Sequence, residues 1–224
     1  MQENCGSVVR FAKNSTGRDF VCGDIHGCFD DLEDELKKVD FDKMRDRLFC
    51  VGDLIDRGPK PELAVEYLSM DWFFSTMGNH EKMFCIANTN GLPKSMRDSF
   101  TESHAGNGGE WAYKLPAWER RAIVDAVRAL PLVIQVGDAV VLHAAMPEVE
   151  SLDEIEDDPG LYENTILWFR DDEYPEVRIP GVNRVFVGHT IVGQPMEDGK
   201  HINIDTGAFF RHWGSAGKLT IMEI

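Results

Sequence analysis

The sequence lacks the features of a membrane-spanning, secreted or disulfide-stabilised protein. Its longest apolar runs, at 132–136 and 139–142, are far shorter than the roughly 20 residues that a membrane-spanning helix needs. Residues 1–10 contain neither the basic nor the apolar segment of a signal peptide. The chain has five cysteines: Cys5, Cys22, Cys28, Cys50 and Cys85. Because they are odd in number and lack CxxC spacing, they predict neither a disulfide framework nor a zinc–thiolate site, and we expect a cytoplasmic protein.

Basic residues are also scarce. The chain carries 23 Lys and Arg against 39 Asp and Glu, a formal net charge of -16. A surface of that sign repels nucleic acid and anionic membranes, so we expect neither as a partner. A bound divalent cation can reverse the field locally, so an anionic substrate is still compatible with this composition. With 224 residues and 43% hydrophobic content the chain can bury a core, and we expect one domain over 1–224.

Short apolar runs alternate with helical periodicity in the first half of the chain, which predicts βαβ units around a mostly parallel sheet. The expected strands there are 20–22, 48–51 and 73–77, and the expected helices are 28–39, 61–69 and 81–87. The later pattern predicts a helix at 118–130, a hairpin of 132–136 and 139–142, and strands at 184–187, 201–204 and 219–224. Two polar stretches have no periodicity: we expect 88–110 to be an irregular excursion and 148–163 a solvated loop or short helix.

Five apolar runs each lead into side chains that can ligate a metal ion, namely Asp24, His26, Asp53, Asn79, His143 and His189. In open α/β folds, ligand sites lie at the carboxyl edge of the strands, where these residues are expected to converge. The set is too large for one tetrahedral ion, and its oxygen and nitrogen atoms suit Mn, Fe or Zn. It predicts two divalent ions about 3.5–4 Å apart, bridged by one carboxylate, for which Asp53 is the candidate.

Nearby residues supply groups that can handle a phosphate substrate. Arg57 follows the second Gly-Asp motif by four residues, where its guanidinium can bind phosphate oxygens in a bidentate manner. His80, in the Gly-Asn-His-Glu motif, can protonate a leaving oxygen as a cation, and Asp56 can orient it. Arg170 offers a second guanidinium.

Each motif taken alone has a simpler explanation. Gly-Asp is ordinary turn chemistry after a strand, and Gly-Asn-His-Glu can be the N-cap of a helix. Arg170 can form a surface ion pair with its acidic neighbours at 171–173, and Asn107-Gly-Gly-Glu-Trp111 can be a flexible loop held by an aromatic residue. The combination is more informative than any single motif. Three Gly-Asp or Gly-Asn motifs lie at successive βα junctions, and two strand-terminal histidines follow them, so together they favour the dinuclear site. Three histidines lack a comparable context and are left out of the site: His104, His201 and His212.

The motifs GDIHG (23–27), GDLIDRG (52–58), GNHE (78–81), His143 and GHT (188–190) resemble the phosphoprotein phosphatase family of calcineurin-like metallophosphoesterases. More narrowly, Asn107-Gly-Gly with Trp111 and IDTGA at 204–208 resemble the phage lambda protein phosphatase and its bacterial relatives, over a region from about residue 18 to the C-terminus. The resemblance implies an α/β sandwich of two mixed β-sheets flanked by helices. It also implies two divalent ions, most often Mn²⁺.

The resemblance further implies a role for each candidate residue. Asp24, His26 and Asp53 become ligands of one ion, and Asp53, Asn79, His143 and His189 become ligands of the other. Arg57 and Arg170, together with Asn79, become substrate-binding residues, and His80 and Asp56 become the general acid pair.

The implied activity is hydrolysis of phosphomonoesters by direct attack of a metal-bound hydroxide. The expected substrates are proteins phosphorylated on Ser or Thr, with phosphotyrosine and small phosphoesters also accepted. The alternative is symmetrical hydrolysis of diadenosine tetraphosphate at the same site; the Asp56-Arg57 pair favours the phosphatase, because tetraphosphatase-like sequences tend to have Ala at the position of Asp56. A non-catalytic binding module would have damaged ligands, and none is seen. The stretch 148–165 is dissimilar to the family, which leaves substrate preference open.

Overall fold

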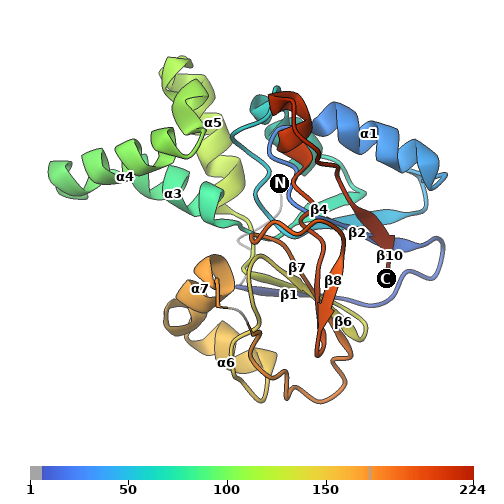
Figure 1. Cartoon of the computed structure of the whole chain (residues 1–224). Coiled ribbons are helices and arrows are strands. Elements are labelled where there is room, and N and C mark those ends of the chain that lie inside the picture. Colours follow the sequence, from blue (N-terminus) through green and yellow to red (C-terminus); the bar gives the residue numbers. More distant parts are fainter. Residues whose placement is uncertain (1–6, 172) are drawn as a thin grey trace.

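Two mixed β-sheets pack face to face, with helices on their outer faces (Figure 1). The computed structural model describes residues 7–171 and 173–224, so Cys5, Asp172 and most of the segment 1–10 lie outside the described residues. The six-stranded sheet has the order β1 (Val8–Phe11), β5 (Val133–Val136), β6 (Ala139–Leu142), β7 (Arg184–Val187), β9 (His201–Asn203) and β8 (Met196–Asp198). The four-stranded sheet has the order β10 (Ile221–Glu223), β2 (Asp19–Cys22), β3 (Arg47–Cys50) and β4 (Phe73–Ser75). Each sheet combines parallel and antiparallel pairs, which confirms the predicted α/β sandwich of two mixed sheets.

The strands direct alternate side chains into the space between the sheets and into the outer helix layers. In β2 and β3, Val21 and Phe49 belong to the core between the sheets, whereas Phe20 and Leu48 belong to a core on the opposite face. Phe186 of β7 enters the core between the sheets from the other side. Because both faces of these central strands are buried, the strands form continuous apolar runs in the sequence, which is why the pattern located them.

Helices cover both outer faces. The core on the outer face of the four-stranded sheet includes α1 (Phe29–Lys38), η1 (Pro61–Leu63), α2 (Ala64–Leu68), α3 (Asn79–Ala87), η2 (Gly109–Lys114), α5 (Ala117–Arg128) and η3 (Ala208–Trp213). On the six-stranded sheet, α6 (Leu152–Asp157) and α7 (Pro159–Trp168) contribute to the corresponding core. Within the described residues, no helix is both long and apolar enough to cross a membrane.

The prediction that 88–110 forms an irregular excursion is wrong, because Lys94–Gly106 form helix α4. Figure 1 shows α4 projecting from the body of the molecule beside α3. Only His104 of this helix is buried, so α4 has little apolar periodicity for a sequence pattern to detect. Packing against α3 and η2 stabilises it instead.

Of the two alternatives predicted for 148–163, a solvated loop or a short helix, the structure shows the helical one, with two helices, α6 and α7. Ser151 begins α6 with a capping box: its hydroxyl accepts the N–H of Asp153 at 3.0 Å, and Glu154 accepts the N–H of Ser151 at 3.1 Å. Pro159 begins α7, where its missing N–H has no helical partner to lose. The capping box of Ser151 and Glu154 is present in the sequence. It is difficult to recognise there, because the surrounding stretch is rich in acidic residues. Buried Ile155 ties this segment to the core of the six-stranded sheet.

Phe186→Ala should lower the free energy of unfolding by about 3–5 kcal/mol, because the side chain is fully buried between the sheets and its removal leaves a cavity. Guanidinium unfolding of the metal-free protein, followed by circular dichroism, measures this change. Trp118→Ala, at an exposed position of α5, is the control and should change the value by less than about 0.5 kcal/mol. A loss below about 1 kcal/mol for Phe186→Ala would contradict a well-packed core between the sheets.

Candidate active site

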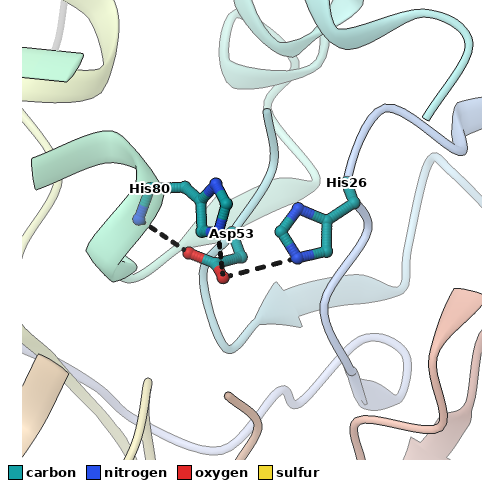
Figure 2. A group of neighbouring side chains, drawn as sticks. All are labelled: His26, Asp53 and His80. Carbon is teal, nitrogen blue, oxygen red and sulfur yellow. Dashed lines mark hydrogen bonds and ion pairs between the residues drawn. The ribbon is translucent and has the colours of Figure 1, made fainter. Parts of the chain in front are cut away.

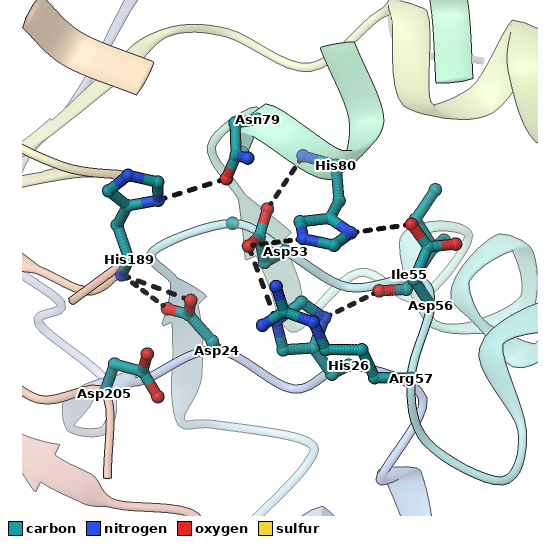
Figure 3. Close-up of polar contacts among 12 residues, drawn as sticks. Asp24, His26, Asp53, Ile55, Asp56, Arg57, Asn79, His80, His189 and Asp205 are labelled. Carbon is teal, nitrogen blue, oxygen red and sulfur yellow. Dashed lines mark hydrogen bonds and ion pairs between the residues drawn. The ribbon is translucent and has the colours of Figure 1, made fainter. Parts of the chain in front are cut away.

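The six predicted metal ligands converge at one edge of the sandwich. They follow the carboxyl ends of β2, β3, β4, β6 and β7, and they are Asp24, His26, Asp53, Asn79, His143 and His189. All six side chains are buried, and Figure 3 shows most of them facing one another. The strand-end pattern in the sequence thus corresponds to a real cluster in space.

Asp53 lies at the centre of this cluster. Its Oδ2 is 3.5 Å from His26 Nε2 and 3.9 Å from His80 Nε2, and its Oδ1 accepts the backbone N–H of His80 at 3.1 Å (Figure 2). Oδ1 also lies 3.5 Å from His143 Nε2. Burial opposes ionisation, but the imidazoles of His143, His80 and His26 outweigh it and lower the pKa of Asp53. The ionised carboxylate therefore presents one oxygen to each half of the site, an arrangement that is compatible with a bridging ligand.

Two adjoining groups of side chains share Asp53 and can each hold a cation. In the first, Asp53 lies with His26 and His80, and in the second with His143 and His189; within each group the ligand atoms are at most 4.8 Å apart. The amide of Asn79 adjoins the second group. His143 Nε2 is 2.9 Å from Asn79 Oδ1 and 3.2 Å from His189 Nδ1. The arrangement has two parts, but the first group contains His80, the predicted general acid, in place of the predicted ligand Asp24.

Asp24 lies outside these two groups, beside Asp205 (Figure 3). Its carboxylate accepts the backbone N–H of His189 at 3.2 Å. Burial and the charges of Asp205 and Asp53 raise the pKa of Asp24, and burial and Asp53 raise the pKa of Asp205 to about 6. Three buried carboxylates at such close range repel one another, and bound divalent cations remove that repulsion. Asp205 was not predicted as a site residue, because its motif contains no ligand pattern of its own.

The histidines carry the tautomer that metal ligands need. The Nδ1–H groups of His26 and His143 donate to the backbone carbonyls of Ile55 (2.8 Å) and Val51 (3.1 Å), which leaves each Nε2 lone pair on the side of Asp53. Burial lowers the pKa of both imidazoles, so both are neutral and able to ligate. The donor set therefore fits two divalent metal ions.

Backbone strain is concentrated at the site. Six non-glycine residues of the described chain have positive φ: His26, Asp40, Asp53, Asp56, Arg57 and His189. All except Asp40 are predicted site residues. A left-handed conformation costs such a residue about 1–2 kcal/mol, so it persists only where surrounding contacts hold it.

Glu81 supplies such contacts to the loop after β3. Its carboxylate accepts four backbone N–H groups, from Asp53 (2.9 Å), Leu54 (2.9 Å), Ile55 (3.2 Å) and Gly78 (2.9 Å). The side chain is fully buried, so water cannot replace these bonds. The sequence indicated Glu81 only as a letter of the GNHE motif and gave it no role.

Three side chains contact the carboxylate of Asp56. Oδ2 accepts the Nδ1–H of His80 at 2.7 Å, which is the predicted acid pair, and Oδ2 also lies 2.9 Å from His104 Nε2. Oδ1 accepts the Nε1–H of Trp111 at 2.8 Å. Burial opposes ionisation, but the contacts with His104 and His80 lower the pKa of Asp56 to about 2. The structure thus places His104, which the sequence gave no reason to include in the site, against Asp56; a contact between such distant segments leaves no spacing signal in the sequence.

The two predicted phosphate-binding arginines line one cavity. Arg57 and Arg170 border a space of about 800 Å³ together with His189, Phe210 and Trp213. Arg57 Nη1 donates to a ring nitrogen of the buried site, His26 Nε2, at 2.8 Å. The cavity thus joins the guanidinium groups to the candidate metal ligands.

The fold and the site together define a class of enzyme. The family model of calcineurin-like phosphoesterases matches residues 20–193. The chain belongs to the calcineurin-like metallophosphoesterase family, and its α/β fold and paired ligand groups are those of a metal-dependent phosphoester hydrolase.

Named relatives fall into two groups. The chain is 32% identical over 214 residues to serine/threonine-protein phosphatase 1 of Salmonella typhimurium, covering 92% of this chain and 91% of that protein. It is 27% identical over 164 residues to a symmetrical bis(5'-nucleosyl)-tetraphosphatase of Shewanella baltica, covering 71% of this chain and 55% of that protein.

Solved structures share the fold at lower identity. A candidate diadenosine tetraphosphatase has a TM-score of 0.66 at 23% identity and covers 98% of each chain. A cold-active protein tyrosine phosphatase has a TM-score of 0.63 at 18% identity and covers 99% of this chain and 77% of its own. These structures confirm the sandwich architecture. They do not identify the substrate, which has to be inferred from the site itself.

Glu81→Gln should lower the free energy of unfolding by about 1–3 kcal/mol, because the amide NH₂ faces backbone N–H donors that then lack an acceptor. Denaturant unfolding of the metal-free protein measures the loss. Glu102→Gln, at an exposed position of α4, is the matched control and should be neutral. Equal stability of the two variants would show that the Glu81 carboxylate does not hold the loop.

Asp53→Asn should abolish binding of one ion and weaken binding of the other by at least about tenfold, because both ligand groups share this carboxylate. Calorimetric titration of metal-free protein with Mn²⁺ measures stoichiometry and affinity, and the wild type should bind two ions per chain. Asp40→Asn is the matched control, since Asp40 also has positive φ but is exposed. A wild-type stoichiometry of one would overturn the dinuclear assignment.

Proposed function

We propose that the protein is a serine/threonine protein phosphatase that also hydrolyses phosphotyrosine and small phosphomonoesters. The observation that supports this substrate class most is the buried pair of His80 and Asp56 beside the two ligand groups. A serine or threonine alkoxide is a poor leaving group that needs a proton, and this pair can supply it. The relationship to a named protein phosphatase over 92% of the chain supports the same substrate class.

The proposed cofactor is a pair of divalent ions, most often Mn²⁺, in a cytoplasmic enzyme without nucleic-acid or membrane partners. Two groups of ligands would hold them, with Asp24 and Asn79 beside the groups that share Asp53. When bound, two such ions lower the pKa of water and neutralise charge on a phosphate. The neutral imidazoles and the buried carboxylates of this site are suited to that binding.

His80 is the proposed proton donor. Its Nδ1–H is committed to Asp56 at 2.7 Å, so the other nitrogen, Nε2, is the one that faces the side of Asp53, 3.9 Å away (Figure 3). The charges of Asp53 and Asp56 outweigh burial and raise the pKa of His80, which keeps a proton available at neutral pH. Arg57 and Arg170, at the wall of the cavity, are placed to bind phosphate oxygens.

Symmetrical diadenosine tetraphosphate hydrolysis is the second candidate function. The observation that favours it is the aromatic side of the cavity, where Phe209, Phe210 and Trp213 offer faces on which an adenine can stack. Against it, the leaving group in that reaction is a phosphate, which needs less protonation than an alkoxide and makes less use of the acid pair. A non-catalytic module is disfavoured because every proposed ligand and acid is present.

A side-by-side assay tests the proposal. With Mn²⁺, the protein should release phosphate from phosphoserine and phosphothreonine peptides faster than it cleaves diadenosine tetraphosphate, and a chelator should abolish both reactions. Phosphate release and nucleotide chromatography measure the two rates at equal substrate concentration. Faster cleavage of the dinucleotide would establish the second candidate instead. Undiminished hydrolysis by metal-free protein would exclude both.

A further inference from the structure

The carboxylate of Asp56 has more partners than an acid pair requires. Besides His80, it contacts His104 of α4 through Oδ2 at 2.9 Å and Trp111 of η2 through Oδ1 at 2.8 Å. A carboxylate rotates readily about its terminal torsion, because that torsion has broad, roughly two-fold minima. With both oxygens engaged, rotation of Asp56 would break contacts at both ends, so the orientation of the oxygen that receives His80 is fixed.

His104 is itself held as a rigid group. It is fully buried, its ring stacks on Phe84 at 5.0 Å between centroids, and its Nδ1 lies 2.9 Å from the hydroxyl of Tyr113. Asp56 is the acidic group that its Nε2 reaches. A buried imidazole is costly unless its polar atoms are used. Nδ1 is hydrogen-bonded to the Tyr113 hydroxyl, whereas Nε2 has the short contact with Asp56 Oδ2 without hydrogen-bond geometry.

Two consecutive glycines, Gly108 and Gly109, let the backbone pass close to Arg57 and to the ring of His104. A Cβ on Gly109 would lie 2.2 Å from the His104 ring, and a Cβ on Gly108 would lie 2.9 Å from Arg57 Cγ. Gly108 also has a φ of +103°, which a side chain would disfavour. The Asn107-Gly-Gly motif is therefore not simply a flexible loop: it lets the segment between α4 and η2 pack directly on the site.

We infer that His104 is a positioning residue for the general acid, holding Asp56 in the orientation that directs the proton of His80 toward the leaving oxygen. This inference rests on the proposed phosphomonoesterase function. It extends the acid pair to a buried group of four side chains drawn from three helical segments and one loop. His104 would not touch substrate; its effect would pass through Asp56.

Leaving-group dependence tests this role with the Mn²⁺-loaded enzyme. His104→Ala should lower kcat by at least about tenfold for a phosphoserine peptide and by less than about threefold for p-nitrophenyl phosphate, whose leaving group needs little protonation. KM should be unchanged for both substrates. His104→Gln, which keeps an N–H donor, should recover part of the lost kcat. Trp111→Phe keeps an aromatic ring but removes the donor to Oδ1 of Asp56, and it should show the same selective loss. This variant provides the test of Asp56 orientation if His104→Ala does not fold.

His201→Ala is the matched control, because His201 is an equally buried histidine that accepts the N–H of Met146 at 3.0 Å in a different core. Any loss in this variant should be equal for the two substrates. A second readout needs no metal: the Nδ1 proton of His80 should give a downfield, slowly exchanging resonance in metal-free wild type and in His201→Ala, and a faster-exchanging one in His104→Ala.

The outcomes separate this inference from the proposed function. Equal losses on both substrates in His104→Ala, or wild-type rates on both, would overturn the positioning role. If the wild type cleaves the dinucleotide faster than the phosphoserine and phosphothreonine peptides, the proposed function fails, and a series of aryl phosphates of graded leaving-group pKa still tests His104. In that series a steeper dependence of kcat on leaving-group pKa in His104→Ala than in wild type supports the role, and an unchanged slope refutes it.

Discussion

The buried charge of Asp53 is the constraint on which the rest of the site depends. An ionised carboxylate inside a protein is costly unless positive or polar groups surround it. Here the imidazoles of His26, His80 and His143 approach its two oxygens, and their presence lowers its pKa despite burial. Because Asp53 and these histidines follow four different strands, with His80 in the first turn of α3, surrounding one carboxylate brings four segments of the chain together. The order of the strands and the positions of the candidate ligands therefore both serve to surround the buried carboxylate of Asp53.

The backbone around this charge is strained, and Glu81 offsets the strain. Asp53, Asp56 and Arg57 all have positive φ within one short loop. The four N–H groups that reach Glu81 fix the start of that loop and the start of α3 to a single buried side chain. A loop held this way presents its carboxylates in fixed positions before any ligand binds, which reduces the reorganisation that catalysis must otherwise include.

The sequence predicted those features of the structure that follow from local patterns of apolar and polar residues. Central strands were predicted because both of their faces are buried, and the clustering of the candidate metal ligands was predicted because each follows the end of such a strand. Contacts between distant segments left no such pattern. His104 lies in a polar helix without a periodic apolar face, and Asp205 follows a short strand with no ligand spacing. Strand β1 was also missed, because it is defined by its parallel pairing with β5, far along the chain.

The segment between α4 and η2 connects the cavity with the buried pair of Asp56 and His80. Its residues 105–108 line the cavity with Arg57 and Arg170, while His104 and Trp111 at its two ends contact Asp56. Any change in the position of this segment would therefore alter both the wall of the cavity and the contacts of Asp56. The chain has a net charge of -16, so under the proposed function attraction for phosphate would come from Arg57, Arg170 and bound divalent ions rather than from the surface. Under the proposed function, discrimination between substrates would accordingly be a short-range property of this cavity, set by its arginines, its aromatic side chains and the proposed acid pair.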